Sequence, residues 1–348
     1  MEGQIASLLL AWFAVHRREL PWREDRPRNP YHVWISEIML QQTRTETVKA
    51  YFSAWTERFP TVKDLAAAEE AEVLRAWQGL GYYSRARNIH KAARIMAERY
   101  GGRFPSEEKD IRDLPGIGDY TAGAILSMAY GKKVPAVDGN VLRIYARLYD
   151  IEEDITRTAG KKAIRKKAEE TMPDNAGDFN EALMDLGSEV CIPRNPRCGV
   201  CPLAACCEGF RKGKADRLPV RAPRKKQKEY DVLCAVWVRD GKVLLHKRSA
   251  EGMLASMWEF PAVLSEPAGK ALPEGRKALE SFLGGTAETL IWSHTHVFTH
   301  RIWHMKAYLF EDGQVPEGEY RWFTAEEYRK IPLAGPHARL AAAAEKYL

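Results

Sequence analysis

The sequence of 348 residues lacks any apolar run close to the roughly 20 residues that a membrane-spanning helix needs. It also lacks the composition of a collagen or of a disordered chain, since 45% of its residues are hydrophobic and 29% are charged. No secretory signal is evident at the N-terminus, because Leu8, Leu9 and Leu10 are soon followed by Arg17 and Arg18. We therefore expect an intracellular, cytoplasmic protein.

The positive charge is concentrated in one stretch. The formal net charge of the chain is +6, yet residues 211–228 contain nine Lys or Arg against one Asp. Pro219 and Pro223 in the same stretch favour an extended linker, which we place at residues 211–229. Such a run either binds the phosphates of a nucleic acid or is a solvated spacer, and the charge alone does not distinguish them.

Hydrophobic periodicity divides the chain into two parts. Apolar residues recur at helical spacing from residue 5 to about residue 186. The expected helices include residues 6–15, 31–44, 45–59, 85–99, 120–130, 141–149 and 176–186. After the linker, the alternating segments 231–239 and 242–247 flank Asp240-Gly241, which predicts a β-hairpin. We therefore expect a multidomain protein, with an all-α domain at 1–210 and an α+β domain at 230–348.

Five of the six cysteines lie within residues 191–207. In a reducing compartment this crowding favours a metal centre over disulfides. Thiolates suit either zinc or an iron–sulfur cluster, and a single CxxC pair favours the cluster without deciding the matter. A structural role for the metal outweighs a redox role. The candidate ligands are Cys191, Cys198, Cys201 and Cys207.

A second motif, Leu114-Pro-Gly-Ile-Gly118, joins two expected helices within residues 107–130. Gly116 and Gly118 allow positive φ angles and a close approach to the backbone, and the following helix begins with unpaired N–H groups. The motif is therefore either a site for a phosphate of the DNA backbone or an ordinary turn between helices.

Two carboxylates are candidates for catalysis. Glu37 lies in the apolar segment 31–44, with Gln41 and Arg44 expected on the same polar stripe. An acid on so apolar a helix can have a raised pKa and act as a proton donor. Asp138 precedes a helix, where it is either only an N-cap or a carboxylate that stays ionised.

Several motifs together match a known family over nearly the whole chain. They are Leu20-Pro-Trp-Arg23, Ser36-Glu-Ile-Met-Leu-Gln-Gln-Thr43, Gly79-Leu-Gly-Tyr-Tyr-Ser-Arg85, Leu114-Pro-Gly-Ile-Gly118, Val137-Asp-Gly-Asn-Val141, Phe179-Asn-Glu-Ala-Leu183 and the four cysteines. The chain thus resembles the adenine DNA glycosylases of the MutY type, in the helix-hairpin-helix DNA glycosylase superfamily. The resemblance implies excision of adenine mispaired with 8-oxoguanine or guanine in double-stranded DNA, and a [4Fe–4S] cluster at the cysteines.

The resemblance also implies roles for single residues. Glu37 would protonate N7 of adenine, which makes the base a neutral leaving group. Asp138 would face the oxocarbenium-like sugar, and Tyr120 would support that intermediate. The other residues would bind DNA: Arg23 and Glu181 at the adenine edge, Gln42 and Tyr82 in the base stack that the flipped nucleotide leaves, and Gly116 and Gly118 at the backbone.

Tyr120 also distinguishes related activities. Members of the superfamily that cleave the strand carry a Lys at this hairpin position, because a Schiff base needs an amine. We therefore expect a monofunctional glycosylase, and a monomer is the default for an enzyme that scans duplex DNA. A glycosylase–lyase is an alternative that needs the missing Lys, and a non-enzymatic DNA-binding scaffold leaves Glu37 and Asp138 without a role.

The C-terminal part resembles the Nudix-like domain of the same family. Residues 252–261 match its characteristic segment, with Met257 where Leu is usual. A Nudix hydrolase holds Mg²⁺ with a glutamate-rich box, and residues 261–290 contain none, so we expect no hydrolase activity. The family's Phe-Ser-His loop, which reads 8-oxoguanine, corresponds to Phe298, Thr299 and His300, where Thr keeps the hydroxyl. Residues 26–29 form a segment longer than the family norm.

Overall fold

The computed structural model describes residues 2–25, 27–223, 226–265 and 272–348. Contacts between residues divide the chain into two compact units. The first unit is formed by Met1–Ala68 and Asn88–Pro223, and the second by Glu69–Arg87 and Arg224–Leu348. None of the described helices is both long enough and apolar enough to cross a membrane.

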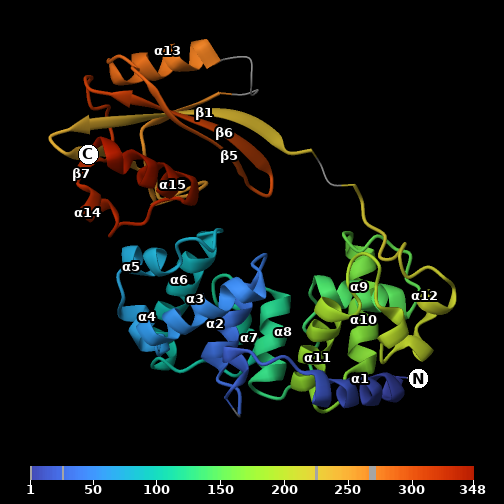
Figure 1. Ribbon diagram of the computed structural model, residues 1–348. Helices are drawn as coiled ribbons and strands as arrows, with labels where there is room; N and C mark the ends of the chain where they lie inside the picture. The colour runs from blue at the N-terminus through green and yellow to red at the C-terminus, as the bar shows by residue number, and fades with distance from the viewer. Residues whose placement is uncertain (1, 26, 224–225, 266–271) are drawn as a thin grey trace. The chain divides into compact units, whose positions relative to one another are not determined.

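The chain up to residue 223 is helical in its described part, as the sequence predicts, and Figure 1 shows these helices from blue to yellow-green. The helices are α1 (Glu2–His16), η1 (Pro21–Arg23), α2 (Pro30–Leu40), α3 (Thr45–Arg58), α4 (Val62–Ala67), α5 (Glu70–Ala76), α6 (Ser84–Tyr100), α7 (Glu108–Arg112), α8 (Asp119–Met128), α9 (Gly139–Leu148), α10 (Thr158–Thr171), α11 (Ala176–Glu189), η2 (Cys198–Val200), η3 (Ala204–Cys206) and α12 (Glu208–Arg211).

Helix α2 is the central helix of the first unit. Asn29 caps its start by accepting a hydrogen bond from the backbone N–H of Tyr31, and Pro30 is its first residue. Eight of its eleven residues are buried, because α3 and α8 pack against it. A carboxylate on this helix is therefore placed in the protein interior.

The predicted extension of this helix to residue 44 is wrong. Helix α2 ends at Leu40, and Gln42 has φ +59°, which a helix cannot accommodate. Gln41 and Arg44 therefore do not continue the polar stripe of Glu37. Arg44 instead lies at the N-cap position of α3.

The second unit contains a seven-stranded sheet with strand order β3-β2-β1-β6-β5, in which β4 pairs with β1 and β7 with β2. Its elements are β1 (Lys228–Arg239), β2 (Lys242–Lys247), β3 (Trp258–Glu259), β4 (Ala262–Ser265), α13 (Leu272–Leu283), β5 (Leu290–Val297), β6 (Arg301–Phe310), β7 (Tyr320–Phe323), α14 (Ala325–Tyr328), α15 (Gly335–Ala344) and η4 (Glu345–Tyr347). Strands β1 and β6 are parallel, and the other pairs are antiparallel.

The predicted β-hairpin is confirmed. Asp240 (φ +50°) and Gly241 (φ +68°) both adopt left-handed angles between β1 and β2. Two such residues form the tight turn whose twist matches that of paired strands.

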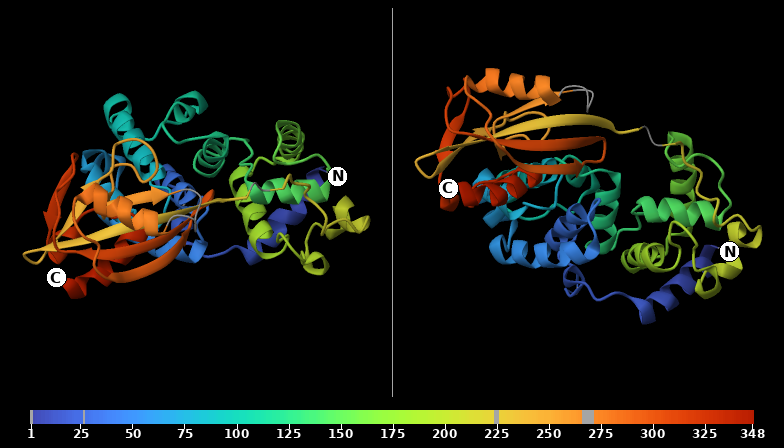
Figure 2. Two further views of the ribbon diagram at one scale, coloured as in Figure 1. Left: turned by 90° about the horizontal axis from the view of Figure 1, so that it is seen from above. Right: turned by 45° about the horizontal axis from the view of Figure 1, so that its top comes forward.

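Helices cover both faces of this sheet, as Figures 1 and 2 show. On one face, α13 buries Leu279 and Leu283 against Trp237 and Phe310. On the other face, α15 contributes Leu340 to a separate apolar cluster with Trp303, Phe260 and Met305. The predicted α+β architecture is therefore observed, with the hydrophobic core split into two layers by the sheet.

The first half of the basic linker is attached to the helical unit. The Nε of Arg147 donates a hydrogen bond to the carbonyl of Leu218 (3.0 Å), and the backbone N–H of Ile155 donates one to Val220 (3.1 Å). Lys212 and Lys214 both form ion pairs with Asp150, which neutralises part of the charge in this stretch. Among the described linker residues, Arg217 and Arg221 make no ion pair.

Candidate functional site

A cavity of about 610 Å³ in the helical unit contains most of the predicted substrate site. This volume lies within the range of small-molecule binding sites. Its lining includes Glu37, Tyr120, Asp138, Arg23, Glu181 and Gln42. Residues from six separate helices and loops therefore meet at one cavity, although most of them are far apart in the sequence.

Glu37 is the buried acid of this cavity. Its residue surface is only 4% exposed, and the hydroxyl of Tyr120 donates a hydrogen bond to its Oε2. Burial is the largest influence on this carboxyl and raises its pKa from 4.5 to about 7. Nearby Asp138 and Glu181 also raise the pKa, whereas the Tyr120 hydroxyl and Arg23 lower it. Glu37 can therefore carry a proton near neutral pH.

Asp138 is both an N-cap and a residue of the cavity. Its Oδ1 accepts hydrogen bonds from the backbone N–H groups of Asn140 and Val141, both at 2.8 Å, and its Oδ2 accepts one from the Asn140 side chain at 2.8 Å. Burial raises its pKa above the ordinary value, while these three donors act in the opposite direction. Asp138 can therefore be both the N-cap of α9 and a carboxylate of the candidate site, because capping α9 fixes the carboxylate at the cavity wall.

Arg23 and Glu181 belong to a buried network of charges beside Glu37. Arg23 donates two hydrogen bonds to Asp185 (2.8 and 3.1 Å), and its Nε lies 3.4 Å from Oε2 of Glu181. Asp185 is completely buried and also accepts a hydrogen bond from the Nε of Arg18 (2.7 Å). Every carboxylate of this network is therefore paired, as buried charges require.

The sequence analysis missed three members of this network: Arg18, Arg28 and Asp185. Asp185 follows Glu181 by four residues, so a search for acids on the same face of α11 would have found it. Arg28 binds Glu181 through both carboxylate oxygens, at 3.0 and 2.7 Å. No local pattern identifies this contact, because its partners are 153 residues apart.

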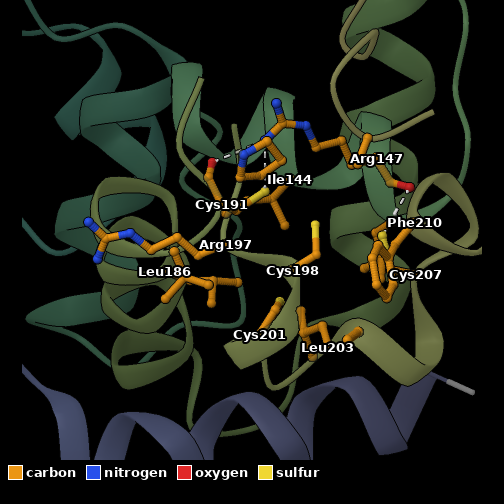
Figure 3. Close-up of a pocket in the computed structure, with 15 residues that line it drawn as sticks. Ile144, Arg147, Leu186, Cys191, Arg197, Cys198, Cys201, Leu203, Cys207 and Phe210 are labelled. Carbon is orange, nitrogen blue, oxygen red and sulfur yellow. Dashed lines mark hydrogen bonds between the residues drawn. The ribbon is translucent and has the colours of Figure 1, made fainter. Parts of the chain in front are cut away.

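The four predicted cysteine ligands line one small cavity, which Figure 3 shows. Cys191 follows α11, Cys198 is the first residue of η2, Cys201 directly follows η2, and Cys207 precedes α12. No three His, Cys, Asp or Glu side chains among the described residues are close enough to hold a single metal ion. Four thiols around one cavity suit a multi-iron cluster better than one tetrahedral ion, because a cluster separates its ligands further.

The cysteine cavity is connected to the predicted catalytic carboxylate by hydrogen bonds. Arg143 donates from Nε to the carbonyl of Cys191 (2.7 Å) and from Nη2 to Oδ1 of Asn140 (2.8 Å). Asn140 in turn donates to Asp138. Arg147 also contacts the cysteine loop, because its Nη1 lies 3.3 Å from Sγ of Cys191 (Figure 3). Hydrogen bonds through Arg143 and Asn140 thus connect the cysteine loop to Asp138.

The two glycines of the hairpin differ in conformation. Gly116 has φ +80°, and a Cβ there would lie 2.7 Å from the side chain of Asn88, so this position requires glycine. Gly118 has φ −95° and open space around it, so it does not use the left-handed angle that glycine allows. Gly118 is exposed at the N-cap of α8, where the first N–H groups of a ten-residue helix are accessible to an anion.

The two predicted wedge residues, Gln42 and Tyr82, share an unusual backbone. Both are non-glycine residues with positive φ, at +59° and +47°. Such residues cost of order 1 kcal/mol or more and persist where the surrounding structure holds them. The angle directs Gln42 into the cavity of the helical unit, whereas Tyr82 belongs to the second unit.

The predicted recognition loop lies between β5 and β6. Phe298 packs on Trp303, with ring centroids 4.9 Å apart, while Thr299 and His300 are exposed. Together with Tyr82, the three loop residues line a second cavity of about 520 Å³, within the second unit.

The chain is similar to known DNA repair proteins. A profile of the "HhH-GPD superfamily base excision DNA repair protein" family matches residues 35–173, and one of the "NUDIX domain" matches residues 232–343. The adenine DNA glycosylases of Rattus norvegicus and Homo sapiens are each 34% identical over 94% of this chain, and the matches cover 75% and 71% of their lengths.

Solved structures agree with these sequence matches. A thermostable thymine-DNA glycosylase matches 61% of this chain and 97% of its own at 30% identity, with a TM-score of 0.55. A trapped covalent intermediate of endonuclease III with DNA matches 61% and 98% at 25% identity, with a TM-score of 0.52. The predicted architecture, a helix-hairpin-helix glycosylase fold followed by a Nudix-like domain, is confirmed.

The burial of Glu37 predicts a pH-dependent stability. In the folded protein this carboxyl ionises at about pH 7 rather than at 4.5, so stability falls as the pH rises through this window. Glu37→Gln removes the ionisation, and we expect its free energy of unfolding to exceed that of the wild type by about 3 kcal/mol above the window and by little below it. Urea unfolding at several pH values measures the difference.

The matched control for this experiment is Glu57→Gln, which changes an exposed carboxylate on α3. It should leave the pH dependence of unfolding as in the wild type. An equal gain in stability for Glu37→Gln at acidic and alkaline pH would contradict the raised pKa.

Proposed function

Since the chain belongs to the adenine DNA glycosylase family, and is therefore a base excision repair enzyme that acts on adenine, we propose that it removes adenine paired with 8-oxoguanine or guanine. The reaction is hydrolysis of the N-glycosidic bond of a flipped nucleotide. One observation carries this proposal: a buried acid with a pKa of about 7, Glu37, lines the same cavity as the N-capping carboxylate Asp138.

Glu37 supplies the proton for bond cleavage. Adenine is a poor leaving group as an anion, and a proton delivered to N7 allows it to leave as a neutral base. The hydroxyl of Tyr120 donates to Oε2 of Glu37, so this bond leaves Oε1 as the oxygen that presents the proton to the base. Glu37 is buried, so the acid is largely shielded from bulk water.

Asp138 stabilises the sugar from which the base has departed. The C1′ carbon becomes positively charged as the bond breaks, and a fixed carboxylate lowers the energy of that oxocarbenium-like state. The three hydrogen bonds from Asn140 and Val141 hold Asp138 in position before the reaction begins. Water then adds to C1′, and its proton returns to the Glu37 carboxylate, which restores the acid.

The remaining predicted residues hold the substrate. Arg23 and Glu181 line the cavity next to Glu37 and bind the edge of the adenine ring. Gln42 and Tyr82 fill the position in the base stack that the flipped nucleotide vacates. Because flipping a nucleotide out of the stack costs a few kcal/mol, we expect side chains to fill the position that it leaves. Gly116 and Gly118 offer backbone N–H groups to a phosphate, and Arg217 and Arg221 of the linker add positive charge.

The protein acts as a monomer with three segments, the glycosylase domain at 1–210, the linker at 211–229 and the Nudix-like domain at 230–348. The hairpin position that carries Lys in the strand-cleaving members carries Tyr120 here, and a phenol cannot form a Schiff base with the sugar. The enzyme is therefore monofunctional.

The first test uses duplexes with adenine opposite 8-oxoguanine, adenine opposite guanine, or thymine opposite 8-oxoguanine. We expect a strand break at adenine only, and only after treatment with alkali. Glu37→Gln should lower the rate of excision by about 100- to 10,000-fold, since it removes a general acid, while affinity for DNA changes little. Breaks without alkali would contradict monofunctionality, and normal excision by Glu37→Gln would contradict the role of the acid.

Recognition of the opposite base belongs to the loop Phe298, Thr299 and His300. The Thr299 hydroxyl and the His300 ring can hydrogen-bond to the N7–H or O8 edge that distinguishes 8-oxoguanine from guanine. Both residues are exposed, so DNA can reach them without a change in the fold. The Nudix-like domain has no hydrolase activity of its own, because the glutamate-rich box is missing from residues 261–290.

Phe298→Ala and His300→Ala should each reduce the preference for 8-oxoguanine over guanine by about tenfold, with a smaller effect on total affinity. The comparison of single-turnover rates on the two mispairs measures this preference. Phe282→Ala, which removes an exposed phenylalanine from α13, is the matched control and should leave the preference unchanged. Normal preference in both loop variants would contradict the assignment.

The four cysteines fit a [4Fe–4S] cluster, which would fix the shape of their loop. Burial raises the pKa of Cys201 to about 12, so a thiolate at this position needs the positive charge of a metal centre. The hydrogen bond from Arg147 to Cys191 also suits a thiolate ligand. The group has a structural role here, and the steps above use none of its chemistry.

Cys198→Ser should lower the content of iron and acid-labile sulfide in the purified protein and lower its melting temperature, because one of four ligands is lost. Cys206→Ser is the matched control, since Cys206 lies in the same loop but does not line the cavity. Equal iron and sulfide in the two variants, or zinc without sulfide in the wild type, would contradict the cluster.

A further inference from the structure

Arg28 is a charged residue deep in the protein for which neither the sequence pattern nor the mechanism has a use. Its side chain is only 3% exposed, yet it does not line the substrate cavity. Burying a guanidinium is costly unless it is paired, so its position requires an explanation.

The contacts of Arg28 converge on one residue of the cavity. Its Nε donates to Oε1 of Glu181 (3.0 Å) and its Nη2 donates to Oε2 (2.7 Å). Its Nη1 donates to the backbone carbonyls of Arg23 and Asp25, which holds the guanidinium in place. Arg28 therefore connects the end of η1 to Glu181 on α11.

This pairing fixes the orientation of the Glu181 carboxylate. The terminal torsion of a glutamate side chain is broad, so a carboxylate held at one point can rotate. Two parallel hydrogen bonds from a planar guanidinium remove that freedom. Arg23 approaches Oε2 of the same carboxylate (3.4 Å) but is engaged mainly by Asp185, so it does not replace Arg28.

We propose that Arg28 is a positioning residue for base selection: it holds the Glu181 carboxylate oriented so that it accepts a hydrogen bond from the exocyclic amine of the target purine. An ionised carboxylate is an acceptor only, so it attracts a purine with an amine at this edge and repels one with a carbonyl. This inference rests on the proposed function, in which Glu181 binds the adenine edge. It extends that function by explaining what keeps Glu181 selective.

The test compares two bases in otherwise identical duplexes opposite 8-oxoguanine: adenine, and unsubstituted purine, which has no exocyclic amine. Arg28→Gln should lower the single-turnover rate of adenine excision by about tenfold or more, because Glu181 loses its bidentate partner. The rate for purine should change by less than about twofold, since that base makes no bond for Glu181 to lose. The ratio of the two rates is the measured quantity.

Two further variants make the result decisive. Arg28→Lys keeps the charge but not the paired donors, so it should retain folding and show an intermediate loss in the ratio. Arg94→Gln removes an exposed arginine of α6 and should leave both rates unchanged. Thermal unfolding of each variant identifies any that do not fold, and Arg28→Lys then provides the comparison.

An equal loss on adenine and purine, or no loss on either, would overturn the role of Arg28 in selection. Failure of the proposed function gives a different result, because the wild-type protein would then leave adenine in place. The two failures are therefore distinguishable within one set of measurements.

Discussion

Removal of the Glu37 carboxyl from water is the interaction on which the rest of the site depends. Burial on α2 raises its pKa to about 7, so the group can hold a proton near neutral pH, as the proposed role of a general acid requires. Asp138 lines the same cavity in a different environment, in which three N–H donors favour its charge. Burial raises the pKa of Asp138 as well, and the three donors oppose that shift, so the cavity holds one carboxyl that can retain a proton near neutral pH and one whose charged form is hydrogen-bonded, the pair that the proposed hydrolysis uses.

The surrounding structure stabilises this unfavourable burial. Helix α2 packs between α3 and α8, and the charges beside Glu37 are paired in a network centred on Asp185 and Glu181. The cysteine loop is connected to the other carboxylate of the cavity, since Arg143 donates hydrogen bonds to Cys191 and Asn140, and Asn140 donates one to Asp138. Hydrogen bonds within the helical unit thus connect Asp138 to the cysteine loop, and Glu181 to Arg28.

Local sequence patterns predicted the parts of the fold that depend on local physics. The apolar helix around Glu37, the capping aspartate Asp138 and the Asp240-Gly241 turn are all present as expected. The end of α2 was predicted too late, because the left-handed Gln42 leaves no signal in the hydrophobic periodicity. The pairing of Arg28 with Glu181 joins residues 153 positions apart, which no local pattern can reveal.

The pH dependence of single-turnover excision tests the central claim most directly. If Glu37 donates the proton, the rate of adenine release is constant on the acidic side of about pH 7 and falls by about tenfold for each further unit, because the proton donor is lost. Formation of the enzyme–DNA complex must stay saturated across this range. A rate that is constant through about pH 9, or that rises with pH, would contradict the account.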